Sequence, residues 1–420
     1  MSTAAMPAPT KLDDLGVRRS VLDDLGLKIL YLQGEMSLGD LAEQMRVNLN
    51  IAEDIFQRLR KEQLVEVTGM SGAVRRVVTT SGGKSRAMEL LNISQYAGPA
   101  PVPLEEYVSR VRAQTVRITN FRPADVEVAF RHLVIEQQML ARIGTALTSG
   151  RAIFLYGPTG TGKTSIAETL SRLVGRESVW IPYAVAVDGQ IITVFDEHLH
   201  RRSEEPTPKG YDQRWVLCKR PRIVVGGELT VEMLDLQLNP STRFYTAPIQ
   251  MKANNGLLIV DDFGRQRVPP DLLLNRWVVP LDRHVDFLTL AGGVKLEIPF
   301  DLCVVFASNL DPAKLVDEAF LRRIQTKIKV DNVTPEQFHK IFENVCAEFK
   351  VGYDPRIVDH AIELITGPMK RSLVPCYPRD LVQQIVWSAK YFSKPAVLDD
   401  AALITACENY FVMNEPTAEN

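Results

Sequence analysis

The stretch Gly157-Pro158-Thr159-Gly160-Thr161-Gly162-Lys163-Thr164 decides the fold, because it forms a phosphate-binding loop between a predicted strand and a predicted helix. The apolar run 152–156 precedes the loop, and the helix begins near Ser165. Glycines let backbone N–H groups curl around phosphate oxygens, Lys163 reaches the β- and γ-phosphates, and Thr164 brings a hydroxyl to Mg²⁺. The positive end of the following helix also faces the anion. Residues 157–165 are therefore predicted to bind a nucleoside triphosphate.

The composition is that of an ordinary globular protein. The chain has 420 residues, 45% of them hydrophobic and 24% charged, and a formal net charge of −2. This length allows two or three domains, and the small net charge gives no global electrostatic case for nucleic acid. No apolar run approaches the roughly 18 residues that cross a bilayer, and the first residues do not resemble a signal peptide. We therefore expect a cytoplasmic protein with no membrane partner.

The cysteines and histidines predict neither a disulfide framework nor a zinc site. The five cysteines are scattered, odd in number and without a C-x-x-C pair, so we expect reduced and mostly buried thiols. His198 and His200 flank one residue but lack a set of partner ligands.

The N-terminal part is predicted to hold a small helical domain. Residues 1–11 are small and polar and are expected to form a disordered tail. Within 12–96, helical spacing covers 21–33, and capping pairs at Ser37 with Asp40 and at Asn50 with Glu53 begin helices over 38–45 and 51–63. Two short strands follow, at 64–67 and 74–79. The pattern resembles a winged helix domain.

Winged helices bind either DNA or proteins, and both roles remain open for residues 12–96. Residues 1–96 hold twelve Lys or Arg and twelve Asp or Glu, so this part has no net positive charge for phosphates. Glu53 and Asp54 begin the third helix, where they would repel DNA. Four basic residues on or just after the second strand keep phosphate contact possible: Arg75, Arg76, Lys84 and Arg86. We favour protein docking.

A Pro-rich stretch at 97–103 is predicted to be a semi-rigid linker that ends this domain. Beyond it, helices are expected over 104–115 and 124–147, so an ATPase core should span 104–331.

A second motif follows the apolar run 257–260, which describes a buried strand of a parallel sheet. Two acids end this strand, as in a Walker B motif. Asp261 is predicted to hold Mg²⁺, and Asp262 to orient and deprotonate the attacking water. The alternative for Asp262 is that it only caps the next turn.

Three further polar positions complete the candidate site. Asn309 ends the apolar strand 302–307 and can hold the lytic water, or can merely start the turn before Asp311. One of the adjacent residues Arg322 and Arg323 is a natural arginine finger, and the other is expected to pair with an acid. Arg379 opens a helix after Pro378 and either faces the phosphates or is simply solvated.

This ordered set resembles the AAA+ superfamily of ATPases, with sensor 1 at Asn309, the finger at Arg322 or Arg323 and sensor 2 at Arg379. The resemblance implies ATP and Mg²⁺ as cofactors, a parallel α/β core, a helical lid at 332–413 before a tail at 414–420, and a homo-oligomeric ring. The ring usually has six subunits, with each active site at a subunit boundary. Asp262 departs from the family, where glutamate is usual, and this puts the geometry of the base in doubt.

Extra material between Thr164 and Asp261 predicts an insert, and 287–290 with 294–298 predicts a β-hairpin around 291–293. This hairpin resembles one found in the AAA+ branch of the MoxR-like chaperones, where hairpin and insert contact the substrate. Residues 224–229 and 244–248 are candidate insert loops, or equally edge strands. The main hypothesis is an ATPase that remodels a protein client. The alternatives are a DNA-directed machine and a nucleotide-gated scaffold with weak hydrolysis.

Overall fold

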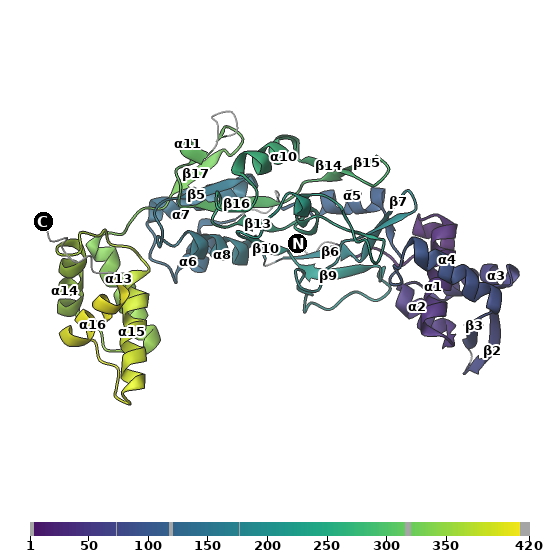
Figure 1. The fold of residues 1–420 in the computed structure, drawn as a ribbon, viewed down its shortest axis with the longest axis horizontal. Coiled ribbons are helices and arrows are strands. Elements are labelled where there is room, and N and C mark those ends of the chain that lie inside the picture. Colours follow the sequence, from purple (N-terminus) through teal and green to yellow (C-terminus); the bar gives the residue numbers. More distant parts are fainter. Residues whose placement is uncertain (1–3, 73, 117–120, 176, 316–320, 412–420) are drawn as a thin grey trace, which may run out of the picture.

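The computed structural model describes residues 4–72, 74–116, 121–175, 177–315 and 321–411. The molecule is elongated, with an α/β core in the middle (Figure 1). The N-terminal unit, residues 12–96, lies at one end of it, and the helices that follow residue 334 lie at the other end. Within the described ranges, no helix combines the length and the apolar character that crossing a bilayer requires.

The core is a five-stranded parallel sheet, as predicted. Its strands lie in the order β10 (Arg222–Val225), β13 (Leu257–Val260), β16 (Cys303–Ser308), β5 (Ile153–Tyr156) and β17 (Thr326–Lys329). Every neighbouring pair is parallel, and Tyr156 lies opposite both Ser308 and Lys329. The carboxyl ends of the strands therefore meet at one edge, where ligands bind in open α/β sheets.

Helices cover both faces of this sheet, which explains the continuous apolar runs of its strands. Ile153 and Leu155 pack in one cluster with α6 (Pro123–Phe130), α7 (Gln137–Ser149) and α8 (Lys163–Val174). Phe154 points to the other face, in a cluster with Trp277 of α10 (Pro270–Arg283).

The single helix expected over 124–147 is wrong, because residues 131–136 separate α6 from α7. The consecutive β-branched residues Val134 and Ile135 disfavour a continuous helix there.

The predicted insert and hairpin are both present. The insert contains a two-stranded sheet of β6 (Ser178–Pro182) and β9 (Trp215–Lys219). It also contributes four strands of a second sheet: β7 (Ala184–Val187), β8 (Gln190–Thr193), β11 (Gln237–Leu238) and β12 (Tyr245–Thr246). The hairpin consists of β14 (Val285–Thr289) and β15 (Lys295–Pro299), closed by a hydrogen bond from Leu290 N to Val294 O.

The two candidate insert loops, 224–229 and 244–248, are partly built into strands. Residues 222–225 form the edge strand β10 of the core sheet, because their apolar side chains alternate between buried and exposed positions. In the second stretch, Phe244 packs edge-on against Tyr96, with ring centroids 5.6 Å apart. Of the first stretch, only 224–225 lie in the strand, and an exposed turn at Gly227 and Glu228 follows it, whereas the second stretch packs against the N-terminal unit.

The Pro-rich stretch 97–103 is packed rather than a semi-rigid spacer. Ala100 and Val102 are fully buried, and β4 (Val102–Pro103) completes the insert sheet by pairing with β7. The nitrogen of Ala100 donates to the carbonyl oxygen of Met45. The composition of this stretch predicts a linker and gives no sign of this burial.

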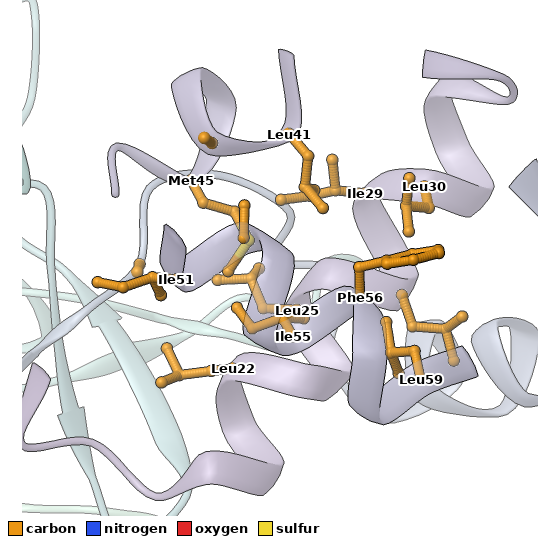
Figure 2. Close-up of a cluster of buried hydrophobic side chains, with 14 of the residues drawn as sticks. Leu22, Leu25, Ile29, Leu30, Leu41, Met45, Ile51, Ile55, Phe56 and Leu59 are labelled. Atoms are coloured by element: carbon orange, nitrogen blue, oxygen red, sulfur yellow. The ribbon is translucent and has the colours of Figure 1, made fainter. Parts of the chain in front are cut away.

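The N-terminal unit contains the predicted helices and strands. After the 3₁₀ turn at Leu12–Leu15 come α1 (Arg19–Gln33), α2 (Leu38–Met45), α3 (Leu49–Lys61), the strands β2 (Val65–Ser71) and β3 (Val74–Thr79), and α4 (Ser81–Ile93). A short strand β1 (Met36–Ser37) pairs with β3. Figure 2 shows the shared core, in which Leu25, Ile29 and Phe56 are buried.

The helix caps of this unit are partly as predicted. The Ser37 and Asp40 capping box begins α2, which confirms that cap. The cap predicted at Asn50 is wrong, because Asn48 Oδ1 accepts a hydrogen bond from Asn50 N and lets α3 begin at Leu49.

The tail expected to be disordered contacts the insert over its described residues. Ala8 N donates to Gly210 O at 2.8 Å, and Asp212 N donates to Met6 O at 2.9 Å. Beside it, the buried Arg214 binds the carboxylate of Asp212 and donates to the carbonyl oxygens of Leu15 and Pro101. These partners hold the N-terminal unit against the insert.

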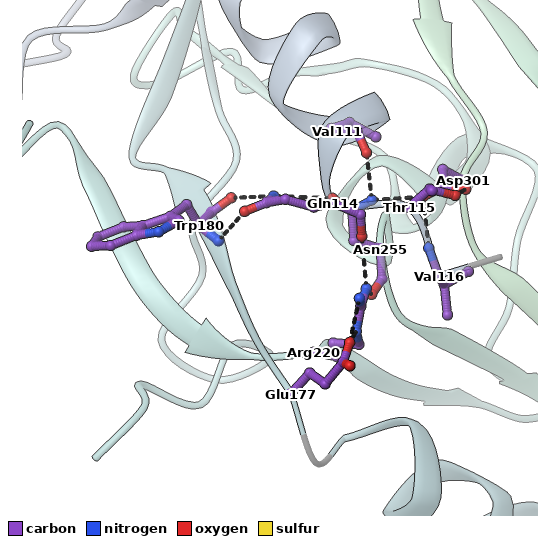
Figure 3. A network of polar contacts seen from close by, with 9 residues as sticks. All are labelled: Val111, Gln114, Thr115, Val116, Glu177, Trp180, Arg220, Asn255 and Asp301. Carbon is purple, nitrogen blue, oxygen red and sulfur yellow. Dashed lines mark hydrogen bonds and ion pairs between the residues drawn. The ribbon is translucent and has the colours of Figure 1, made fainter. Parts of the chain in front are cut away.

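A second polar network, drawn in Figure 3, joins the insert to the core sheet. Arg220 donates to the carbonyl oxygens of Gln114 at 2.9 Å and Asn255 at 2.8 Å, and pairs with Glu177 at 2.7 Å. Gln114, just after α5 (Leu104–Ala113), exchanges hydrogen bonds with the backbone of Trp180 in β6. Satisfied polar networks of this kind rigidify the interior.

The C-terminal helical unit contains α13 (Pro335–Phe349), α14 (Pro355–Thr366), α15 (Tyr377–Tyr391) and α16 (Asp400–Tyr410). It has its own core, which includes Phe338, Phe342 and Leu381. All five cysteines are free and four of them are buried, as expected.

Candidate nucleotide-binding site

The loop between β5 and α8 has a backbone that only glycine adopts without strain. Gly157, Gly160 and Gly162 have φ angles of 147°, 82° and 88°. A Cβ on Gly157 would collide with the carbonyl oxygen of Val330, and a Cβ on Gly160 would lie 2.8 Å from Cys376 Sγ. The glycines therefore allow the loop its backbone conformation. They also let Val330 and Cys376 approach the loop closely.

Lys163 and Thr164 open α8 at the carboxyl edge of the sheet. The Lys163 ammonium donates to the carbonyl oxygens of Gly157 at 2.9 Å and Pro158 at 2.7 Å, so it lies over the loop. Burial lowers the pKa of Lys163, and the charges of Asp261 and Asp262 oppose that shift. Both carboxylates are thus close enough to act electrostatically on the loop lysine.

The predicted magnesium ligands lie together. Thr164 Oγ1 lies 3.0 Å and 3.3 Å from the two carboxylate oxygens of Asp261. Among the described residues, no three His, Cys, Asp or Glu side chains gather around a possible metal position. A hydroxyl with one carboxylate fits Mg²⁺, which keeps several waters and takes few protein oxygens.

Asp262 follows in a turn at the same edge. It is exposed, has a φ of 48° and donates its N–H to Asp261 Oδ1 at 3.0 Å. Aspartate and asparagine tolerate this left-handed conformation better than longer residues do. The turn is closed by the backbone bond from Arg265 N to Asp262 O. The shorter acid at this position therefore suits the local backbone.

Asn309 leaves β16 facing the loop. Its Nδ2 donates to Thr159 Oγ1 at 3.4 Å. Its Oδ1 is buried and, in the described part of the chain, has no hydrogen-bond partner. The following turn is capped by Ser308 and Asp311, whose side-chain oxygens accept from Leu310 N and Ala313 N. A buried amide oxygen without a partner costs about 1–3 kcal/mol, which favours a ligand or water at this position.

A cavity of about 520 Å³ lies beside the loop, between the core and the C-terminal helical unit. Its wall includes Gly160 and Ser165 of the loop, the segment 132–136, and Asp331 and Asn332 after β17. This volume is in the range of small-molecule and cofactor sites.

Arg379 lines the same cavity from α15. Its guanidinium forms two hydrogen bonds with the carboxylate of Glu348 in α13, at 3.0 Å and 2.5 Å. These bonds lower the pKa of the Glu348 carboxyl.

Arg322 and Arg323 lie away from the loop of their own chain. They precede β17, whose first residue Thr326 lies opposite Ile153 at the start of β5, so they belong to the amino edge of the sheet. Arg323 Nε donates to Asp282 Oδ2 at 2.8 Å, whereas Arg322 is exposed. Residues 317–320 of the helix predicted there lie outside the described residues.

Sequence reasoning missed three parts of this cavity: Glu348, Cys376 and the segment 132–136. In the sequence, Glu348 looks like any other surface residue of the helix α13. Cys376 is one of five scattered cysteines. No local signal distinguishes Glu348 and Cys376, because their positions at the cavity depend on how the C-terminal helical unit packs on the loop. Residues 132–136 reach the cavity from the connection between α6 and α7.

Fold and site together define the class of this chain: a parallel α/β protein with a glycine-rich loop of P-loop sequence at the carboxyl edge of its sheet. A model described as a domain of unknown function, DUF8689, matches residues 334–409, which is the C-terminal helical unit. No curated protein matches the chain.

Solved structures that are similar to this chain include those of NtrX and RuvB. NtrX from Brucella abortus, in complex with ADP, aligns with 11% identity and a TM-score of 0.41 over 70% of this chain and 59% of that one. A mutant form of RuvB from Thermotoga maritima aligns with 12% identity and a TM-score of 0.39 over 66% of this chain and 69% of that one. The chain thus spans less than two thirds of NtrX.

Proposed function

We propose that the chain is an AAA+ ATPase that binds ATP with Mg²⁺ and hydrolyses it to ADP and phosphate. The observation that carries this proposal is the convergence of Lys163, Thr164 and Asp261 at one edge of a parallel sheet. The oxygens of Thr164 and Asp261 are 3.0 Å apart, and the Lys163 ammonium lies over the same loop.

Each side chain has a role in this proposal. The loop N–H groups and Lys163 bind the phosphates, while Thr164 and Asp261 hold Mg²⁺, which supplies charge neutralisation when bound. Asp262 accepts the proton of the attacking water, and Asn309 orients that water through its amide.

The arginines would complete the charge balance. Arg379 reaches the phosphates from α15, on the wall of the same cavity. Arg322 or Arg323 serves the site of a neighbouring subunit, so the active form is a homo-oligomeric ring, with six subunits favoured. The position of these two arginines at the amino edge of the sheet supports action across a boundary.

A protein client, as for MoxR-like chaperones, is favoured over DNA. Within the winged-helix-like unit, both wing arginines are already paired with acids: Arg75 with Glu53, and Arg76 Nε with Glu35 Oε1 at 2.9 Å. Phosphate contacts would have to displace these partners, which weakens the electrostatic term that dominates DNA binding. The hairpin β14–β15 and the insert provide the elements that contact substrate in that branch.

Three measurements test the proposal on the full chain, because the N-terminal unit is packed against the insert. Steady-state phosphate release with ATP and Mg²⁺ should be abolished by Lys163→Ala. Proteins that co-purify with an Asp262→Asn variant trapped with ATP should include the client. Duplex DNA titrated at two salt concentrations should bind weakly at both; tight, salt-sensitive binding would favour the DNA-directed alternative.

The nucleotide-gated scaffold remains a second candidate because of Asp262. This acid is one methylene shorter than the usual glutamate and is exposed. ATP binding without measurable phosphate release, in preparations shown to be assembled, would favour that candidate over an active ATPase.

A further inference from the structure

Glu348 and Arg379 form an ion pair on the wall of the nucleotide cavity. The two hydrogen bonds between their head groups measure 3.0 Å and 2.5 Å, and the guanidinium carbon lies 5.7 Å from the ring centroid of Phe349. Carboxylate, guanidinium and ring thus fix one position for the arginine. Both charged residues line the cavity that also contains Gly160, Gly162 and Ser165.

The start of α15, the helix that carries Arg379, contacts the phosphate-binding loop directly. Cys376 at the start of α15 lies so close to Gly160 that a Cβ on that glycine would be 2.8 Å from its sulfur. Arg379 follows three residues later, which is about one helical turn. Arg379 and the loop residues Gly160 and Gly162 line one cavity, so open volume lies between the arginine and the loop.

The pair is not needed to hold the helices together. Its side chains are 50% and 55% exposed, and exposed ion pairs contribute little to stability. The packing of α13 on α15 comes from buried residues such as Phe342 and Leu381. A pair of this kind can exchange partners at small cost, and a phosphate offers a guanidinium the same two-oxygen geometry as a carboxylate.

We propose that Glu348 is a competing counter-charge that holds Arg379 on α13 until the terminal phosphate of a nucleoside triphosphate takes its place. The exchange would make the ion pair between Glu348 of α13 and Arg379 of α15 depend on whether a triphosphate or a diphosphate is bound. This inference rests on the proposed function, because it requires a nucleotide in the cavity.

A double-mutant cycle on the full chain tests the exchange, with ATP and ADP affinities measured by calorimetry in the presence of Mg²⁺. Glu348→Gln frees the arginine and should tighten ATP binding about two- to fivefold, the range expected from breaking an exposed ion pair. ADP binding should tighten less than twofold. In an Arg379→Ala background, Glu348→Gln should change neither affinity, because no arginine remains to be released.

Three results would overturn the exchange while leaving nucleotide binding intact. The same tightening with and without Arg379 would mean that Glu348 only repels the nucleotide. Equal tightening for ATP and ADP would remove the role of the terminal phosphate. No tightening in either background would mean that the ion pair does not compete. A wild-type chain that binds neither nucleotide would overturn the proposed function together with this inference.

Glu343→Gln is the matched control. Glu343 lies on α13 and pairs with Lys340 at 2.7 Å, but it does not line the cavity. Its substitution removes the same charge from the same helix and should leave both affinities unchanged. Thermal unfolding of all variants should stay within a few degrees of the wild type, because every substituted side chain is at least half exposed.

Discussion

The hydroxyl oxygen of Thr164 lies 3.0 Å from a carboxylate oxygen of Asp261, although 97 positions separate the two residues in the sequence. Thr164 follows the loop after β5, and Asp261 follows β13, with β16 between these two strands. Parallel strands in register bring all three carboxyl ends to one edge, so two short local motifs become neighbours. The insert, which contributes four strands of the second sheet, lies between the motifs in the chain without disturbing this edge.

Lys163→Ala should weaken ATP binding by roughly 10- to 100-fold, because a charge-assisted contact to the phosphates is lost. The fold should be unaffected, since the hydrogen bonds of the ammonium within the described residues go to carbonyl oxygens of the loop. Calorimetry with ATP and Mg²⁺ measures the loss, and thermal unfolding provides the control. A folded variant with wild-type affinity would contradict the assignment of this loop.

Asp262→Asn should keep ATP binding and lower phosphate release by at least about 10²-fold, the usual worth of a positioned general base. Asparagine suits the φ of 48° at this position, so the turn should be preserved. Steady-state phosphate release and ATP affinity are measured on the same preparation. Normal turnover would mean that another group accepts the proton.

The strand-end residues of the site could be predicted from the sequence, whereas its wall could not. Asp261 and Asn309 each follow an apolar strand, and the tips of parallel strands converge by geometry alone. Glu348 and Cys376 lie on a helical unit with its own core, and only the packing of that unit on the loop brings them to the cavity.

The connection at 97–103 is another part of the fold that the sequence predicts only in part. Its proline-rich composition predicts an extended spacer, and the chain is indeed extended at β4. Burial of Ala100 and Val102 depends on the sheet edge of β7 and on the carbonyl of Met45, both distant in sequence. The composition of such a segment predicts its extended conformation but not which residues bury it.

His200 should make the stability of the insert depend on pH. It is buried, with Nδ1 accepting from Asp196 N at 2.9 Å and Nε2 lying 2.8 Å from Lys252 O, so the neutral ring satisfies both neighbours. Burial lowers the pKa of His200 below its ordinary 6.5. As the pH falls below 6.5, the unfolded chain binds a proton that the folded chain resists, so stability is lost.

His200→Asn should flatten this loss of stability between pH 7 and pH 5, even if the variant is about 1–3 kcal/mol less stable at neutral pH. Urea unfolding at several pH values gives the slope. His198→Asn, at an exposed position two residues away, should retain the wild-type slope. An unchanged slope in His200→Asn would show that other groups set the pH dependence.

We expect the boundary between subunits to supply an arginine to each active site. Arg322 and Arg323 lie at the amino edge of the sheet, and the phosphate-binding loop lies at the carboxyl edge, so a finger at either residue must act on a neighbour. Arg322 is exposed at this edge, where a neighbouring subunit can reach it, whereas the Arg323 side chain is only 28% exposed, and we therefore expect Arg322 to be the finger. Arg322→Ala should lower ATP hydrolysis by about 10³-fold or more while sparing ATP affinity, because a finger acts on transition-state charge.

Mixing separates a finger that acts across the boundary from one that acts within its own chain. Lys163→Ala subunits keep Arg322 but lack a working loop, and Arg322→Ala subunits keep the loop but lack the finger. Co-assembled mixtures should recover part of the phosphate release that each variant lacks alone. Arg323→Ala serves as the matched control, since it removes the same charge from the adjacent position and should retain most activity by itself. No recovery in mixtures shown to co-assemble would mean that Arg322 does not serve a neighbouring site.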